Sequence, residues 1–226
     1  MSEVAGTLAA IASARRPGVA EALCLESSVR GVGAFDRASF ELTFAGVGRR
    51  LGVEVVGPDT SLCDETGRSW SIATWGIDDV GRALLLVEGL THLPESEHVP
   101  WVDTCYRSGA LRERQSILRA LAVLPSPGRF LAVALDGFRA STQPIFEAIA
   151  CENPYPATYF PEASFNQMVL KAVFTEVALA RILDLRDRVT PDLARMAADY
   201  ASERAAAGRS VQCDLALLTG NESVVL

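Results

Sequence analysis

The apolar residues of the chain recur mainly at helical spacing. In residues 36–51, the side chains of Phe40, Phe44 and Val47 fall on one helical face, two arginines occupy the last turn, and Gly52 follows. Cations suit the negative end of the helix dipole, and glycine is common directly after a helix. The pattern therefore predicts a helix over 36–51 that ends at Gly52.

Similar patterns separated by proline and glycine predict most of the remaining elements. They indicate an N-terminal surface or capping helix in 1–18 and helices in 77–90, 99–109, 110–125, 126–142, 145–153, 161–174 and 190–208. Residues 190–208 are the clearest case, because Thr190 is a suitable N-cap, Pro191 suits the first helical position and Gly208 suits the end. Ser126 is expected to cap the helix that it begins, and Pro144 to break or kink the chain.

No strand-like alternation of similar quality occurs, and residues 53–74 are predicted to form a long connection. Short helices joined by tight turns indicate an all-α protein, an irregular α-solenoid or HEAT-like array of short antiparallel helices. We expect a single all-helical domain over 1–226, with a divergent N-terminal part in 1–75 and a helical core in 76–211.

Charge and composition exclude several classes of function. The chain has 226 residues, is 49% hydrophobic and carries a formal net charge of −7. This negative charge argues against a basic face that binds nucleic acid and against binding to an anionic membrane surface. No stretch approaches the roughly 20 apolar residues of a membrane span. We expect a cytoplasmic protein without membrane insertion.

The five cysteines are odd in number, widely spaced and without a CxxC motif. This pattern indicates reduced, mostly buried thiols, as in a cytoplasmic protein. The cysteines are Cys24, Cys63, Cys105, Cys151 and Cys213.

Residues 152–174, ENPYPATYFPEASFNQMVLKAVF, differ from the rest of the chain. Three prolines predict an extended corner from 153 to 161, after which Pro161 starts a helix. That helix is apolar nearly all round, as buried helices are. Gln167 and Lys171 are four residues apart and share one side with Asn166.

Lys171 is the only lysine of the chain, and a buried ammonium group needs a partner. One interpretation is that it reaches the surface or pairs with Glu147, Glu152 or Asp199, which would be a structural role. The other is that it faces a ligand anion, with Asn153, Tyr155, Tyr159 and Phe160 around it as pocket walls or core caps.

Two further polar groups follow helical spacing. Arg139, Gln143 and Glu147 lie four residues apart and form either one face of a binding site or a solvated helix face, with Pro144 leaving the register open.

The second group contains Arg195, Asp199, Glu203 and Arg204, with Tyr200 beside them. The ladder from Arg195 through Asp199 favours a surface salt-bridge face.

Other motifs carry little chemistry. The pair Asp78–Asp79 opens a helix, where acids suit the dipole, and lacks the third acid of a DDxxD magnesium motif. His92 and His98 lack partners at zinc spacing. Residues 46–52 do not match a dinucleotide loop, and there is neither a P-loop nor a GxSxG motif. We therefore expect no metal site and no cofactor.

Two blocks of the sequence resemble the EboA family, namely 146–174 and 193–211. The resemblance is looser in 106–127 and 75–86, so 76–211 is the EboA-like helical core. It implies a role in secondary metabolism, since family members are described as metabolite-traffic proteins that move a precursor across the inner membrane. The family is named for a gene cluster whose other products are the implied protein partners, and it has no established reaction.

Two functions follow from the residues and the resemblance together. The first is a helical binding or adaptor protein for a secondary-metabolite precursor, prenylated or cyclitol-like, that uses Arg139, Asn166 and Lys171 as anchors. The second is a metal-independent acid–base enzyme, an isomerase, cyclase or lyase, with Lys171, Tyr155 and Glu147 as catalytic groups. The predicted binding set is Arg139, Gln143, Glu147, Asn153, Tyr155, Tyr159, Asn166, Gln167, Lys171 and Asp199.

Overall fold

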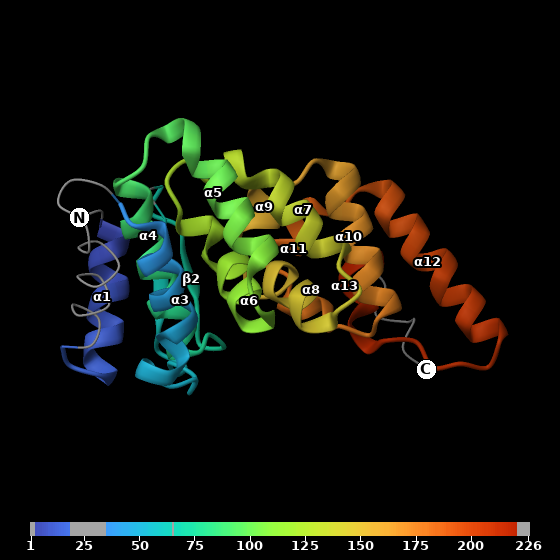
Figure 1. Cartoon of the computed structure of the whole chain (residues 1–226). Coiled ribbons are helices and arrows are strands. Elements are labelled where there is room, and N and C mark those ends of the chain that lie inside the picture. Colours follow the sequence, from blue (N-terminus) through green and yellow to red (C-terminus); the bar gives the residue numbers. More distant parts are fainter. Residues whose placement is uncertain (1–2, 19–34, 65, 221–226) are drawn as a thin grey trace. The chain divides into compact units, whose positions relative to one another are not determined.

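Helices make up nearly all of the regular structure in the computed structural model, which describes residues 3–18, 35–64 and 66–220 (Figure 1). The helices belong to two units, Met1–Ile149 and Ala150–Leu226. The all-α prediction is confirmed. The HEAT-like stacking of the helices and the single domain stay predictions.

The first unit contains most of the helices. Its elements are α1 (Glu3–Arg15), α3 (Arg37–Leu51), α4 (Ile77–Thr91), α5 (Glu95–Ser108), α6 (Leu111–Ala120), η1 (Leu121–Val123), η2 (Pro127–Phe130), α7 (Leu131–Arg139) and α8 (Gln143–Ala150), whose last residue belongs to the second unit.

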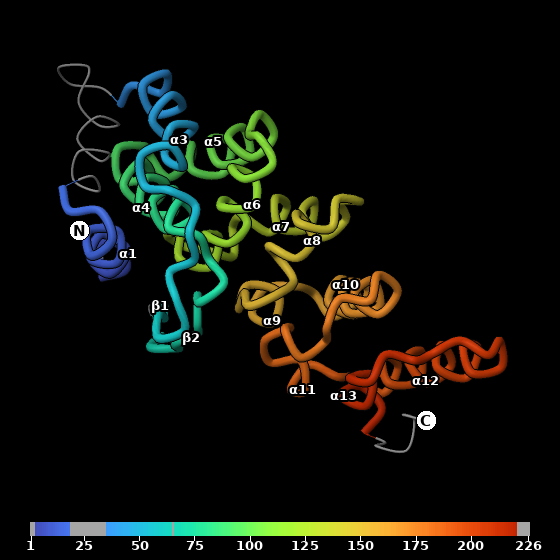
Figure 2. The backbone as a smooth tube through the Cα atoms, turned by 90° about the horizontal axis from the view of Figure 1, so that it is seen from below, coloured from blue at the N-terminus to red at the C-terminus, as the bar shows by residue number. Residues whose placement is uncertain are grey.

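Helix α4 lies at the centre of the hydrophobic core of the first unit. Thirteen of its 15 residues are buried, and it packs against α1, α3, α5 and α6 (Figure 2). Close approach of α3 depends on Gly81, because a β-carbon there would overlap the side chains of Leu51 and Val47. Helix α1 contributes Ala5, Leu8 and Ala12 to this core, so the predicted N-terminal helix is present.

The connection predicted for 53–74 contains a small hairpin. Strands β1 (Ser61–Cys63) and β2 (Ser69–Ser71) pair antiparallel, and the buried side chains of Leu62 and Trp70 lie opposite each other. The prediction of an irregular connection is wrong here. Three-residue strands are too short to show a period of two along the sequence.

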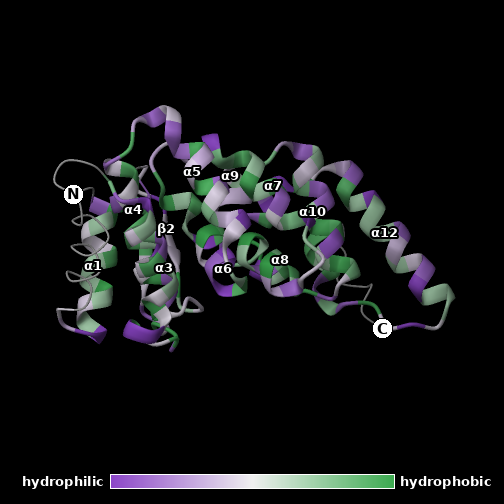
Figure 3. Cartoon of the chain, in the orientation of Figure 1, coloured by the Kyte–Doolittle hydropathy of each residue, from purple (hydrophilic) through white to green (hydrophobic). Residues whose placement is uncertain are grey.

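The second unit begins in the proline-rich corner. It contains α9 (Tyr155–Tyr159), α10 (Glu162–Phe174), η3 (Leu179–Arg181), α11 (Leu185–Arg188), α12 (Pro191–Ala206), η4 (Cys213–Leu215) and α13 (Ala216–Thr219). The helix predicted to be buried is α10, but only six of its 13 residues are buried. Helix α12 follows the predicted pattern, with the Thr190 side chain accepting a hydrogen bond from Leu193 N. Hydrophilic residues recur along α12 (Figure 3).

The predictions about proline and serine are confirmed only in part. Pro144 is the second residue of α8, where its missing N–H needs no partner, so it does not break the helix. Pro161 stands at the start of α10 as predicted, as the N-cap before Glu162. Ser126 is the N-cap before Pro127, as predicted, but it has φ 52° and its side chain makes no capping hydrogen bond. Within the corner, Tyr155–Tyr159 form a helical turn rather than an extended chain.

The cysteines only partly follow the prediction. Of those that the structure describes, Cys105 and Cys151 are buried, whereas Cys63 and Cys213 are exposed. Cys24 lies outside the described residues.

Candidate functional site

The proline-rich corner is a packed part of the second unit. Tyr155 and Asn153 are buried, and the Asn153 Oδ1 atom accepts a hydrogen bond from Tyr155 N at 3.0 Å. The ring of Tyr155 lies 4.8 Å from that of Tyr159 and 6.3 Å from that of Phe160. Burial, with a smaller contribution from Tyr159, raises the pKa of Tyr155. The aromatic rings of the corner therefore contact one another.

Arg188 holds the corner in place. Its guanidinium group donates hydrogen bonds to the carbonyl oxygens of Ala157 and Phe160, the latter at 2.9 Å. The same group lies 4.6 Å from the centroid of the Phe165 ring on α10. Sequence reasoning missed Arg188, because its partners are backbone carbonyls and no residue spacing reports such contacts.

A second arginine holds the start of the corner. Arg181 donates to both carboxylate oxygens of Glu152, at 2.7 and 3.0 Å, and its carbonyl accepts from Glu152 N. Glu152 has φ 47°, a left-handed conformation that is uncommon for glutamate. The corner is thus secured at its start by Arg181 and at its end by Arg188.

The polar residues of α10 have different surroundings. Asn166 Nδ2 donates to the hydroxyl of Thr190 at 3.2 Å, which joins α10 to the N-cap of α12, and its buried Oδ1 atom has no hydrogen-bond partner among the described residues. Gln167 is exposed. Lys171 is half-buried in the last turn, and burial lowers the pKa of its ammonium group.

The remaining predicted residues are divided between the two units. Arg139 ends α7, whereas Gln143 and Glu147 lie on α8, so the break between the helices interrupts the predicted spacing. Gln143 Nε2 donates to Glu147 Oε1 at 2.7 Å. Asp199 is exposed in the second unit and pairs with Arg195 at 3.3 Å, as expected of a surface salt bridge.

A cavity in the second unit, the C-terminal pocket, has a volume of about 260 Å³. It lies where the end of α10, helix α12 and the segment before η4 meet. Its lining residues are Val173, Glu176, Tyr200, Arg204, Ser210, Val211, Gln212 and Cys213. Tyr200 and Arg204 therefore do not belong to the exposed salt-bridge face that the sequence favoured for their group.

Arg204 is the cationic group of the C-terminal pocket. Its Nε atom donates to the Ser210 carbonyl at 2.7 Å, its Nη1 atom donates to the Tyr200 hydroxyl at 3.3 Å, and its guanidinium carbon lies 5.7 Å from the Tyr200 ring centroid. The Glu176 carboxylate is 3.7 Å away. Arg204 is thus held in position while part of its guanidinium group lines the cavity.

The other wall of the C-terminal pocket carries an amide and a thiol. Gln212 Nε2 donates to the Val177 carbonyl at 3.0 Å, and within the described part of the chain its Oε1 atom has no hydrogen-bond partner. Cys213 is exposed. Together with the side chains of Val173 and Val211, the pocket presents apolar surface beside a cation, a carboxylate and an amide, which suits binding of a small amphipathic molecule.

The first unit contains a buried ionic network that sequence reasoning missed. Asp78 is fully buried and accepts hydrogen bonds from Arg82 Nη1 at 2.7 Å and from Arg112 Nε and Nη2 at 2.9 and 2.5 Å. Burial alone would raise the pKa of Asp78, but the hydrogen bonds from Arg112 and Arg82 outweigh burial and lower it.

Asp79 extends this network. Its carboxylate accepts from Gly76 N at 2.8 Å, from the Ser116 hydroxyl at 2.6 Å and from Arg119. Asp79 therefore interacts with the N-terminus of α4, as expected for an acid in the first turn of a helix. Asp78 instead binds arginines on two helices, α4 and α6. The buried carboxylates have protein partners, which indicates a structural role for the network.

Within residues 3–18, 35–64 and 66–220, no group of three or more histidine, cysteine or acidic residues is placed to hold a metal ion. His98 is buried, and its Nε2 atom lies 3.1 Å from the Leu93 carbonyl. Among the described helices, none has the length and apolar character needed to cross a membrane.

Comparison with known families gives a match over most of the chain. A family model described as metabolite traffic protein EboA matches residues 30–220. This range includes every residue that lines the C-terminal pocket. No curated protein and no solved structure matches the chain significantly.

Proposed function

The chain belongs to the EboA family of metabolite traffic proteins, and from this premise we propose that it is a helical binding protein that holds a secondary-metabolite precursor in the C-terminal pocket. In this proposal the protein acts in the cytoplasm as a carrier or adaptor, and its partners are the metabolite and other proteins of the same gene cluster.

The observation that carries the proposal is the position of the C-terminal pocket. Val173 comes from one of the two sequence blocks with the strongest family resemblance, and Tyr200, Arg204 and Ser210 come from the other. A cavity lined by both blocks, with a fixed guanidinium group and an exposed thiol, is a better candidate than the corner, whose aromatic side chains pack on each other.

The lining of the pocket limits the ligand. Drug-sized ligands occupy pockets of about 300–1,000 Å³, so a cavity of about 260 Å³ suits a small molecule or the end of a larger one. Val173, Val211 and the Tyr200 ring would contact apolar carbon. Arg204 and Gln212 would bind hydroxyl or anionic groups. This combination is compatible with a prenylated or cyclitol-like compound.

Native mass spectrometry of protein purified from its own host tests the proposal. We expect a retained small-molecule mass that is lost in Arg204→Ala and kept in Arg195→Ala, an exposed arginine on the same helix. Because Arg204 also binds the Ser210 carbonyl, the melting temperature of each variant shows whether the fold is intact. A retained mass that survives Arg204→Ala in folded protein would contradict the proposal, and so would the absence of any retained molecule.

Cysteine alkylation locates the bound molecule. Cys213 lines the pocket and Cys63 lies in the first unit, and both are exposed. Peptide-resolved labelling with iodoacetamide should modify Cys213 more slowly in the ligand-bearing fraction while Cys63 reacts equally in both fractions. Cys105 is a negative control, since burial raises the pKa of its thiol to about 12. Equal protection of Cys63 would show that the effect is not specific to the pocket.

The alternative of an acid–base enzyme is supported by Lys171, whose pKa is lowered by burial towards the range useful for proton transfer. The raised pKa of Tyr155 makes its phenol a poor proton donor near neutral pH. Since Lys171 is the only lysine, ¹⁵N-lysine labelling gives one side-chain ammonium signal to titrate. An ordinary lysine pKa would remove the support for catalysis.

A further inference from the structure

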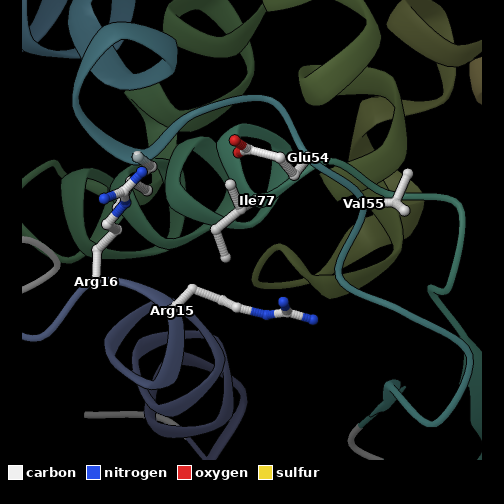
Figure 4. Close-up of a pocket in the computed structure, with 6 residues that line it drawn as sticks. Arg15, Arg16, Glu54, Val55 and Ile77 are labelled. Carbon is white, nitrogen blue, oxygen red and sulfur yellow. The ribbon is translucent and has the colours of Figure 1, made fainter.

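A second cavity lies in the first unit and belongs to different elements. This N-terminal pocket has a volume of about 250 Å³ and is lined by Arg15, Arg16, Leu51, Glu54, Val55 and Ile77. These residues come from the end of α1, the end of α3, the extended segment after it and the first residue of α4 (Figure 4). None of them lines the C-terminal pocket, so the two cavities can be tested separately.

The charged groups of the N-terminal pocket are not paired with one another. Arg15 Nη2 donates to the Val56 carbonyl at 2.5 Å. Among the described residues, the Arg16 guanidinium group and the Glu54 carboxylate form neither a hydrogen bond nor an ion pair. In Figure 4, Glu54 and Arg15 extend on opposite sides of Ile77. The pocket therefore presents separate positive and negative groups over an apolar side chain.

A backbone hydrogen bond and a nearby glycine fix the position of Glu54. The Glu54 carbonyl accepts a hydrogen bond from Ile77 N at 2.8 Å, which joins the extended segment to the start of α4. Gly52 has φ 91°, and a β-carbon there would overlap the Glu54 carboxylate. The glycine thus provides both the left-handed turn and the space that the carboxylate occupies.

From this arrangement we propose that the N-terminal pocket binds a small zwitterion, a molecule with an anionic group at one end and an ammonium group at the other. Arg16 and the remaining donors of Arg15 bind the carboxylate or phosphate group, and Glu54 binds the ammonium group. A simple anion would satisfy the arginines but would leave the Glu54 carboxylate of the same pocket without a partner. Leu51 and Ile77 contact the carbon chain between the two ends.

Isothermal titration of the full chain tests this proposal with four probes. O-phosphoethanolamine and β-alanine each have an ammonium group and an anionic group, which is a phosphate in the first and a carboxylate in the second. Inorganic phosphate has only anionic charge, and ethylamine has only an ammonium group. We expect at least one zwitterion to bind with a Kd at least about tenfold lower than either single-charge probe, because a charge-assisted hydrogen bond contributes about 1.5–3 kcal/mol, a factor of about ten or more. The zwitterion that binds identifies the anion that the arginines prefer.

Variants connect the binding to the named residues. Arg16→Ala and Glu54→Gln should each weaken zwitterion binding about tenfold or more, while Arg195→Ala on α12 leaves it unchanged. Glu54→Gln keeps the size of the side chain and removes only the charge. Arg204→Ala, which tests the C-terminal pocket, should also have no effect, so failure of one site is distinguishable from failure of the other.

Three results would overturn the proposal. One is phosphate that binds as tightly as O-phosphoethanolamine, with no loss in Glu54→Gln. Another is no binding of any probe. The third is a strong coupling between Arg16→Ala and Glu54→Gln in unfolding experiments, which would show that the two side chains pair with each other in solution.

Discussion

Two of the aspartate–arginine pairs in the first unit have the same spacing but differ in burial, and together they test the role of the ionic network. Asp78–Arg82 and Asp103–Arg107 are both four residues apart on a helix, with N–O distances of 2.7 and 2.8 Å. The side chains of Arg82 and Asp78 are 5% and 0% exposed, whereas those of Arg107 and Asp103 are 63% and 34% exposed. Asp→Asn at each position removes one charge and keeps the shape.

Asp78→Asn should be strongly destabilising. Arg82 would lose the carboxylate that it contacts, while its remaining hydrogen bonds, to the Phe44 carbonyl and the Ser116 hydroxyl, are long at 3.2 and 3.3 Å. Removing one member of a buried ion pair typically costs about 3–5 kcal/mol. We expect about 3 kcal/mol, because the amide oxygen of the substituted side chain still accepts a hydrogen bond and the 45% exposed side chain of Arg112 can turn to water.

Asp103→Asn is the matched control, and its expected cost is below about 0.5 kcal/mol, because water screens an exposed pair. Urea unfolding followed by tryptophan fluorescence measures both variants, since Trp70, Trp75 and Trp101 are all buried in the first unit. With a slope near 2 kcal/mol per M, the midpoint should fall by about 1.5 M for the buried pair and by less than about 0.25 M for the exposed pair. Equal shifts would refute the reasoning.

Two further predictions concern pH and backbone conformation. Because the pKa of Asp78 is lowered in the folded state, its stabilising contribution is present above the ordinary carboxyl pKa of about 4 and is lost as the pH falls through the lower, folded value. The stability difference between wild type and Asp78→Asn, from urea midpoints, should therefore shrink from pH 6 to pH 2.5, and a constant difference would contradict this. Glu176 has φ 58°, so Glu176→Gly should raise stability by about 0.5–1 kcal/mol. Thermal unfolding followed by circular dichroism measures this stability. Glu203→Gly on α12 is the control, and it should lose about 0.5–1 kcal/mol because glycine destabilises the interior of a helix. A loss of stability in both variants would exclude backbone strain at Glu176.

The helices could be predicted from the sequence because their signals are local. Gly52 and Thr190 lie at helix ends in the structure, as the capping patterns predicted. A cap depends on backbone groups within three or four residues, so its chemistry is contained in a short stretch of sequence. The apolar composition of α10 predicted its burial only in part, because six of its 13 residues are buried while Phe174 at its end is 59% exposed.

The candidate sites could not be predicted in this way, because their residues meet only after folding. Arg204 contacts Glu176, and the Asp78 carboxylate binds Arg112, 34 positions along the chain. Sequence spacing correctly grouped Tyr200 with Arg204 but could not show that they turn towards a cavity rather than towards solvent. The direction of a helical face depends on which neighbour packs against it.

The sequence by itself determined the helical class, most helix ends and the family, since these depend on local backbone chemistry and on long characteristic stretches. Only the tertiary structure decided the partners of the charged residues. It showed that Arg181 and Arg188 secure the corner, that Asp78 is buried among arginines, and that, among the described residues, Arg16 and Glu54 line one cavity unpaired. The physical reason is that burial and pairing depend on distances between segments that are remote in the chain.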